Sequence, residues 1–211
     1  MSARQTTALL AVAIAVSSIL ATPSSAQART TATRDTAVFA GGCFWGVQAV
    51  FARIKGVTSS ISGYAGGKVA SPSYELVSTG STGHAESVQV IYDPSKVSYD
   101  QLLEVFFAVA HDPTELNRQG PDEGTQYRSA IFFRGASQQR AAQAAISKLG
   151  QGKRYAHPIV TQVVPLSAFY PAEAYHQDYY NTHPNQLYIV LNDKPKVDAL
   201  KRQFASLYDG K

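Results

Sequence analysis

Residues 37–54 read AVFAGGCFWGVQAVFARI, the most strongly patterned segment of the chain. A short apolar run ends at two glycines, Gly41 and Gly42. Apolar side chains then recur with the i, i+3, i+4 and i+7 spacing of one helix face, at Val47, Val50, Phe51 and Ile54. The segment therefore predicts a strand, a tight turn and a helix, with Cys43 at the start of the helix.

Strands and helices alternate through the rest of the chain. A period-2 pattern predicts a strand with Glu86 at the start of its apolar face. Ser98 and Gln101 have the form of a capping box before another helix. We expect Gly150 to end a further helix and Pro171 to lie in the first turn of a short one. The predicted elements are strands at 58–64, 86–92, 127–134 and 159–166 and helices at 98–109, 137–149 and 197–207. One compact α/β domain accounts for this alternation.

The composition is that of a globular protein. The 211 residues are 45% hydrophobic and 16% charged, which excludes disordered, collagenous and long coiled-coil chains. The net charge of +4 is a mild excess without a block of Lys and Arg, so nucleic-acid binding is not indicated. The single cysteine excludes an internal disulfide and a zinc site built on several thiolates.

The N-terminal residues 1–28 have the layout of a secretory signal peptide. Arg4 precedes an apolar run from Ala8 to Ala21, and Ala26-Gln27-Ala28 supplies small residues for cleavage near Ala28. This run is shorter than the roughly 20 apolar residues that a spanning helix needs. We therefore expect an exported, periplasmic protein that leaves the membrane after cleavage, with a flexible segment at 29–35 and a single catalytic domain at 36–211.

Two residue types suggest chemistry. Cys43 follows a strand and two glycines and opens a helix, where backbone N–H groups favour the reactive thiolate; an inert buried cysteine is the alternative. Glu86 on an apolar strand face would have a raised pKa and could act as a general acid, unless it is an exposed first residue of the strand. Phe44 and Trp45 could form an apolar pocket wall or simply pack in the core.

The five histidines do not predict a metal site. No pair has the i, i+4 spacing of a helical zinc site, so we expect no bound metal. His84 could still serve as the base of a cysteine hydrolase. A non-catalytic module that binds peptides in a slot formed by Phe44 and Trp45 is a third alternative.

Several motifs in one order resemble the A-type methionine sulfoxide reductases, the peptide-methionine (S)-S-oxide reductases. The resemblance covers roughly residues 36–208 and begins at the active-site signature Gly42-Cys43-Phe44-Trp45-Gly46. The other matching segments are Tyr64-Ala65-Gly66-Gly67, Pro72-Ser73-Tyr74, Thr82-Gly83-His84-Ala85-Glu86, Tyr92-Asp93-Pro94, His111-Asp112-Pro113 and Gly124-Thr125-Gln126-Tyr127-Arg128-Ser129. The family's fold is an α/β plait, a two-layer sandwich with a central mixed sheet and flanking helices.

The resemblance implies roles for seven residues of the chain. It implies that Cys43 attacks the sulfoxide sulfur of free or peptide-bound methionine-S-sulfoxide and that Glu86 protonates the departing oxygen. The products are methionine and a sulfenic acid on Cys43. The residues implied in substrate binding are Phe44 and Trp45 for the methyl group, Tyr74 and Tyr127 for the sulfoxide oxygen, and Asp122.

The chain resembles the one-cysteine subgroup of that family. Many members carry resolving cysteines in a C-terminal tail, but residues 204–211 contain none. The resemblance therefore implies no bound cofactor and an external thiol, such as a thioredoxin-like protein, that reduces the Cys43 sulfenic acid. We expect a monomer that repairs oxidised proteins and peptides.

Overall fold

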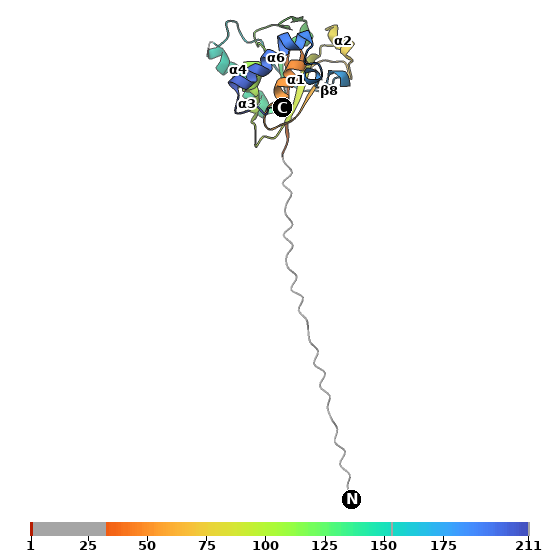
Figure 1. The fold of residues 1–211 in the computed structure, drawn as a ribbon, viewed down its shortest axis with the longest axis vertical. Coiled ribbons are helices and arrows are strands. Elements are labelled where there is room, and N and C mark those ends of the chain that lie inside the picture. The colour runs from red at the N-terminus through yellow and green to blue at the C-terminus, as the bar shows by residue number, and fades with distance from the viewer. Residues whose placement is uncertain (2–32, 153, 211) are drawn as a thin grey trace. The chain divides into compact units, whose positions relative to one another are not determined.

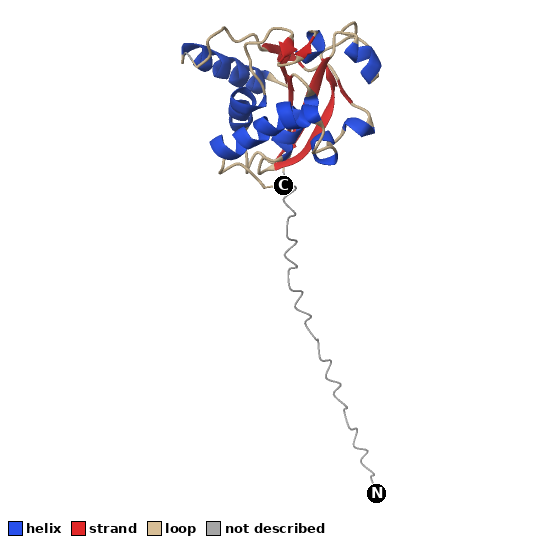
Figure 2. Cartoon of the chain, turned by 45° about the horizontal axis from the view of Figure 1, so that its top comes forward, coloured by secondary structure: helices blue, strands red, loops and turns tan. Residues whose placement is uncertain are grey.

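The computed structural model describes Met1, residues 33–152 and residues 154–210 (Figures 1 and 2). Apart from Met1, the expected signal peptide lies outside the described residues, as does most of the expected flexible segment. The first strand begins at Asp35, inside the segment expected to be flexible. Within the described residues, no helix has the length and apolarity that crossing a bilayer requires.

The described chain contains strands, α-helices and short 3-10 or π-helical turns, the last labelled η. The strands are β1 (Asp35–Gly41), β2 (Val57–Ala65), β3 (Ala85–Tyr92), β4 (Arg118–Gln119), β5 (Asp122–Glu123), β6 (Ser129–Phe133), β7 (Gln162–Pro165) and β8 (Phe169–Pro171). The α-helices are α1 (Phe44–Ala52), α2 (Tyr74–Ser78), α3 (Tyr99–Val105), α4 (Ala136–Gln151), α5 (Tyr179–Thr182) and α6 (Lys194–Gln203). The η turns are η1 (Phe106–Ala110), η2 (Thr125–Tyr127), η3 (Ala174–His176) and η4 (Ile189–Asp193).

Six strands form the central sheet, in the order β7-β6-β1-β3-β2-β8. Among these strands of the described residues, β6 and β7 pair in parallel and the other neighbours are antiparallel. The expectation of a mixed sheet with flanking helices is therefore confirmed. β1 and β3 occupy the centre, so the residues that follow β1 and those that open β3 meet in the middle of the fold.

Apolar side chains divide between the two faces of the sheet. The larger cluster joins one face, through residues such as Phe39 and Val88, to α1, α3, α4 and α6, through residues such as Val50 and Leu200. A smaller cluster covers the other face, with Val38, Ala40, Ala65, Ala85, Ala130 and Phe132 buried. Burial of a large apolar area on one face holds the helical layer against the sheet (Figure 2).

The turn between β1 and α1 depends on Gly42. Its φ of +84° lies in the left-handed region, where glycine carries no steric penalty. A Cβ atom there would also lie 2.4 Å from the Gln119 side chain. The predicted strand, tight turn and helix are therefore present, and the turn brings Cys43 to the N-terminus of α1.

The structure differs from the sequence-based prediction at Gly150, which was expected to end a helix, and at Pro171, which was expected to lie in the first turn of one. α4 runs through Gly150 and ends at Gln151, because an exposed glycine weakens a helix without stopping it. Pro171 ends the edge strand β8 and does not open a helix. An edge strand tolerates proline because the missing N–H need not pair with a second strand.

Candidate active site

Cys43 is the N-cap residue of α1, two residues beyond the end of β1. Its side chain is 7% exposed and forms part of the wall of a cavity of about 280 Å³. The thiol therefore lies at a position that a small substrate group can reach, although its residue packs with the core.

Glu86 reaches the same cavity from the neighbouring strand. The antiparallel register of Phe39 with Val88 brings the start of β3 beside the end of β1. Glu86 is 3% exposed, which contradicts the alternative of an exposed strand terminus. Its Oε2 accepts a hydrogen bond of 3.0 Å from the backbone N–H of Phe44, the residue after the cysteine.

Burial changes the acidity of Glu86. Desolvation raises the pKa of its carboxyl group to about 8, against the opposing effect of the Phe44 N–H; the charges of Asp122 and Asp193 raise it further. At neutral pH most Glu86 side chains therefore carry a proton. This is the state that a general acid requires before it reacts.

All seven residues that the sequence assigned to the site line this one cavity. They are Cys43, Phe44, Trp45, Tyr74, Glu86, Asp122 and Tyr127. The structure adds Gln186 and Tyr188, which the sequence reasoning missed. They precede α6, and no local motif distinguishes Tyr188 among the 12 tyrosines of the chain.

The aromatic wall of the cavity is held rigidly. Phe44 is buried, and its ring packs 6.0 Å from that of Tyr64. Trp45 stacks on Tyr179 with 3.8 Å between ring centroids, and its indole N–H donates to Nδ1 of His176 at 3.1 Å. A substrate methyl group therefore meets rings whose orientation is already fixed.

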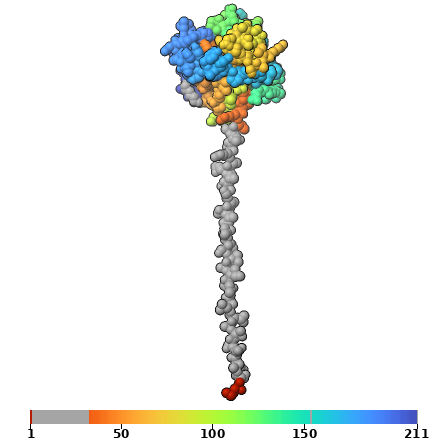
Figure 3. Space-filling model, turned by 90° about the vertical axis from the view of Figure 1, so that its right-hand side faces the viewer, coloured from red at the N-terminus to blue at the C-terminus, as the bar shows by residue number. Residues whose placement is uncertain are grey.

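Glu173 positions Tyr74. One carboxylate oxygen accepts the Tyr74 backbone N–H at 2.8 Å, and the other accepts the Tyr64 hydroxyl at 2.8 Å. Figure 3 shows the yellow segment around α2 and the light-blue segment near residue 173 side by side on one face. Residues separated by 99 and 109 positions in sequence thus cooperate to place one phenol at the cavity.

Asp122 and Tyr188 close the cavity from another side. The Tyr188 hydroxyl donates a hydrogen bond to Oδ2 of Asp122, which belongs to the two-stranded β4-β5 sheet. Burial raises the pKa of Asp122, while this hydrogen bond and the charge of Lys196 oppose the rise. Tyr188 thereby links this small sheet to the segment that leads into η4 and α6.

The expectation that the helix N-terminus favours a thiolate at Cys43 is contradicted by the surroundings of the thiol. Burial raises the pKa of the thiol well above its usual value, and the charges of Glu86 and Asp193 raise it further. The Trp45 N–H and the charge of Lys196 act in the opposite direction but are weaker. Burial therefore outweighs the helix N-terminus, and the resting nucleophile is a thiol.

His84 does not serve the cavity. Its Nδ1 accepts the backbone N–H of Gly67 at 3.1 Å, and its Nε2 lies 2.8 Å from the carbonyl oxygen of Val69. Both ring nitrogens therefore bind a loop, and no histidine is among the described residues that line the cavity. The hydrolase alternative therefore has no histidine base at the cavity.

In the described part of the chain, no group of three His, Cys, Asp or Glu side chains could hold a metal ion.

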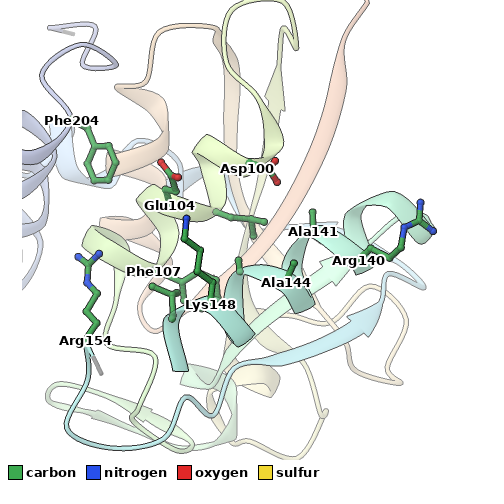
Figure 4. Close-up of a pocket in the computed structure, with 12 residues that line it drawn as sticks. Asp100, Glu104, Phe107, Arg140, Ala141, Ala144, Lys148, Arg154 and Phe204 are labelled. Carbon is green, nitrogen blue, oxygen red and sulfur yellow. The ribbon is translucent and has the colours of Figure 1, made fainter. Parts of the chain in front are cut away.

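A second cavity of about 670 Å³ lies between α3, η1 and α4 (Figure 4). Its wall combines apolar side chains such as Leu103 and Phe107 with charged ones such as Glu104 and Lys148. It shares no lining residue with the Cys43 cavity. Size alone therefore does not identify the reactive site, whereas a thiol beside a buried carboxyl group does.

Known proteins are similar in sequence to this chain over most of its length. The family model for peptide methionine sulfoxide reductase matches residues 35–207. A peptide methionine sulfoxide reductase MsrA 2 of Mesorhizobium japonicum is 56% identical over 177 residues, or 84% of this chain and 91% of that protein. One of Synechocystis is 47% identical, over 87% of this chain and 84% of its own length.

Solved structures agree with these sequence relatives. Methionine sulfoxide reductase A of Corynebacterium diphtheriae has a TM-score of 0.68 and 37% identity, covering 72% of this chain and 76% of its own. The reduced form of Mxr1 from Saccharomyces cerevisiae has a TM-score of 0.67 and 33% identity, covering 74% of this chain and 88% of its own. Since fold, motif order and family model all coincide, the chain belongs to the peptide methionine sulfoxide reductase family.

Proposed function

We propose that this protein reduces methionine-S-sulfoxide, free or in peptides, with Cys43 as the nucleophile and Glu86 as the general acid. Membership of the family supports the reaction. The observation that carries the two roles is the placement of Cys43 and a buried, largely protonated Glu86 in one cavity. A sulfoxide is a poor electrophile until its oxygen is protonated, so an acid and a sulfur nucleophile are needed together.

The proposed step balances without any further reactant. Glu86 gives its proton to the sulfoxide oxygen, the sulfur of Cys43 bonds to the sulfoxide sulfur, and the proton of the thiol passes to the Glu86 carboxylate. The hydroxyl oxygen then moves from the substrate sulfur to the Cys43 sulfur, so the substrate S–O bond breaks; the bond between the two sulfurs breaks with it, and methionine leaves. The enzyme sulfur is oxidised to a sulfenic acid while the substrate sulfur is reduced, and Glu86 ends the step protonated.

The remaining wall of the cavity suits the two ends of a sulfoxide group. Phe44 and Trp45 offer aromatic surface to the methyl group. Burial raises the pKa of both Tyr74 and Tyr127, so their hydroxyls stay protonated and can donate hydrogen bonds to the oxygen. Asp122, held by Tyr188, would accept a hydrogen bond from the substrate backbone.

An external thiol completes the proposed cycle. The sequence contains one cysteine, so the sulfenic acid on Cys43 has no second thiol in its own chain. A thioredoxin-like protein, or a small thiol first, would attack the sulfenic acid, release water and then cleave the mixed disulfide. The cycle so written uses no bound cofactor.

We further propose export to the periplasm and a monomeric state. The composition of residues 1–28 supports export, and in an oxidising compartment the reductant must itself be kept reduced. Fractionation of cells that express the full chain would test the location, and light scattering would test the mass. Retention in the cytoplasm, or a dimeric mass, would contradict these two proposals.

The test of the function uses the two epimers of a methionine-sulfoxide peptide with excess dithiothreitol. Methionine should form from the S epimer, and a Cys43→Ser variant should form none. A folded, reduced protein that turns over neither epimer would overturn the proposal. Equal reduction of both epimers would contradict the assigned stereochemistry, because a fixed aromatic wall should accept the methyl group on one side only.

A further inference from the structure

A buried ion pair lies against the first turn of α1. Asp193 is fully buried at the end of η4, and its Oδ1 lies 3.4 Å from Nζ of Lys196 in α6. Both side chains pack against Gly46. A Cβ atom at Gly46 would lie 2.1 Å from Oδ1 of Asp193 and 3.0 Å from Nζ of Lys196.

The position of the pair matters because the same turn begins at Cys43. Gly46 is the third residue of α1, and Cys43 is its N-cap. The missing side chain at Gly46 allows two charged groups to approach the helix backbone within one turn of the reactive sulfur. In the low-dielectric interior, charges at such range act strongly on one another.

Stability alone gives a weak reason for this pair. A buried ion pair contributes little net stability, because desolvation offsets the attraction between the two charges. Oδ2 of Asp193 has no hydrogen-bond partner among the described residues, although it is buried. Another pair, Asp198 with Lys201, lies within α6 and has the same i, i+3 spacing, but it lies at the surface.

We infer that Lys196, held in place by Asp193, is a positioning residue for the reductase reaction. Its ammonium group lies against Gly46 in the first turn of α1 and stabilises the anion that forms at the Cys43 sulfur when the thiol proton leaves. This inference rests on the proposed role of Cys43 as the nucleophile. Asp193 acts in two ways, because it orients Lys196 and opposes the same anion through its own charge.

The charges around Cys43 support this division of roles. Lys196 is the cation, among the described residues, whose charge lowers the pKa of the thiol, whereas the charges of Glu86 and Asp193 raise it. Glu86 is largely protonated at neutral pH, which leaves Lys196 and Asp193 as the opposing pair. The other ionisable groups of the cavity come from several elements and are Asp122 of β5, Tyr74 of α2, Tyr127 of η2 and Tyr188 before η4.

The test measures the rate at which iodoacetamide alkylates Cys43 in the full chain, as a function of pH and without any sulfoxide. With one cysteine in the sequence, the reaction reports on a single thiol. We expect Lys196→Met to move the profile by about one pH unit upward, which slows alkylation about tenfold below the pKa. Asp193→Asn should move the profile to lower pH and speed alkylation. Lys196→Arg keeps the positive charge and should keep the profile of the parent.

The surface pair of α6 provides the matched control. Lys201 and Asp198 are 48% and 46% exposed, whereas the Lys196 side chain is only 16% exposed. Lys201→Met and Asp198→Asn remove the same charges at the same spacing and should leave the profile unchanged, because solvent screens them. A merely structural pair would move both buried variants in the same direction.

Opposite shifts in Lys196→Met and Asp193→Asn support the inference. Unchanged profiles, or shifts of one sign in both, overturn it. If thermal unfolding shows that Lys196→Met does not fold, Asp193→Asn decides alone, since an unchanged or upward profile contradicts the inference. Alkylation requires no turnover, so an inactive parent enzyme would contradict the proposed function and leave this measurement interpretable.

Discussion

Glu86 and Cys43 show how burial sets the chemistry of individual residues. The same loss of solvent raises the pKa of the carboxyl group, which suits an acid, and that of the thiol, which does not suit a nucleophile. Transfer of the thiol proton to the carboxylate that Glu86 becomes would resolve this conflict. The two residues therefore depend on each other within one step.

Replacement of Glu86 by Gln should slow methionine formation by about 10² to 10⁴, the usual contribution of a positioned general acid. The amide keeps the shape and can still accept the Phe44 N–H at its oxygen, but it has no acidic proton to give. The measurement is kcat/KM for the S-sulfoxide peptide with dithiothreitol. A rate close to that of the parent would remove Glu86 from the acid role.

The pKa of Glu86 near 8 predicts the pH dependence of the chemical step. The acid form is present below that pH and is lost above it, so methionine formation should fall about tenfold per pH unit on the alkaline side. A single turnover of pre-reduced enzyme between pH 6 and 9.5 avoids the ionisation of the reductant. The alkaline decrease in rate should be absent from Glu86→Gln. If it persists in that variant, the decrease belongs to the ionisation of another group.

At the scale of elements, the contact between α1 and η4 depends on a missing side chain. Gly46→Ala would force Asp193 away from the helix, which should lower the free energy of unfolding by about 1–3 kcal/mol. Gly150→Ala is the matched control, because nothing lies within 4 Å and α4 continues through it. This change should raise stability by about 0.5–1 kcal/mol. Urea unfolding measures both, and an unaffected Gly46→Ala protein would contradict the close contact.

Elements with a local signal were predictable from the sequence. The capping box of Ser98 and Gln101 is present, and the helix after the Gly41-Gly42 turn begins next to Cys43, as expected. Gly150 and Pro171 misled the prediction because each residue only weakens or limits an element, and tertiary packing decides the rest. The small β4-β5 sheet has two residues in each strand, too few for any periodicity to show.

At the scale of the whole molecule, the single cysteine limits the number of turnovers, because Cys43 must be reduced by an external thiol after each sulfoxide that it reduces. Fully reduced protein with excess S-sulfoxide and no added thiol should yield about one methionine per chain and a sulfenic acid at Cys43. A sulfenic-acid probe followed by intact-mass measurement would detect the adduct. Continued turnover without thiol would show that another electron source exists.

The extent to which the site could be predicted also depends on scale. Six of the seven expected cavity residues lie in distinctive short segments that match the family, and the seventh, Asp122, lies two residues before the last of these segments. Gln186, Tyr188 and the buried pair Asp193 and Lys196 come from the C-terminal part, where the sequence shows an ordinary amphipathic helix. Their proximity to Cys43 arises only when the segment that contains η4 and α6 packs on α1, and no local pattern encodes that contact.

The central placement of β1 and β3 has a consequence for how long the enzyme stays active. Amide hydrogens in the innermost strands of a sheet exchange with deuterium mainly through global unfolding, whereas edge strands such as β7 and β8 open at lower free energy. We therefore expect Cys43 and Glu86 to be attached to the part of the molecule that exchanges most slowly. The edge strands should then open and close again while the thiol and the acid stay together, so the working lifetime of the enzyme should follow the unfolding half-life of the whole domain.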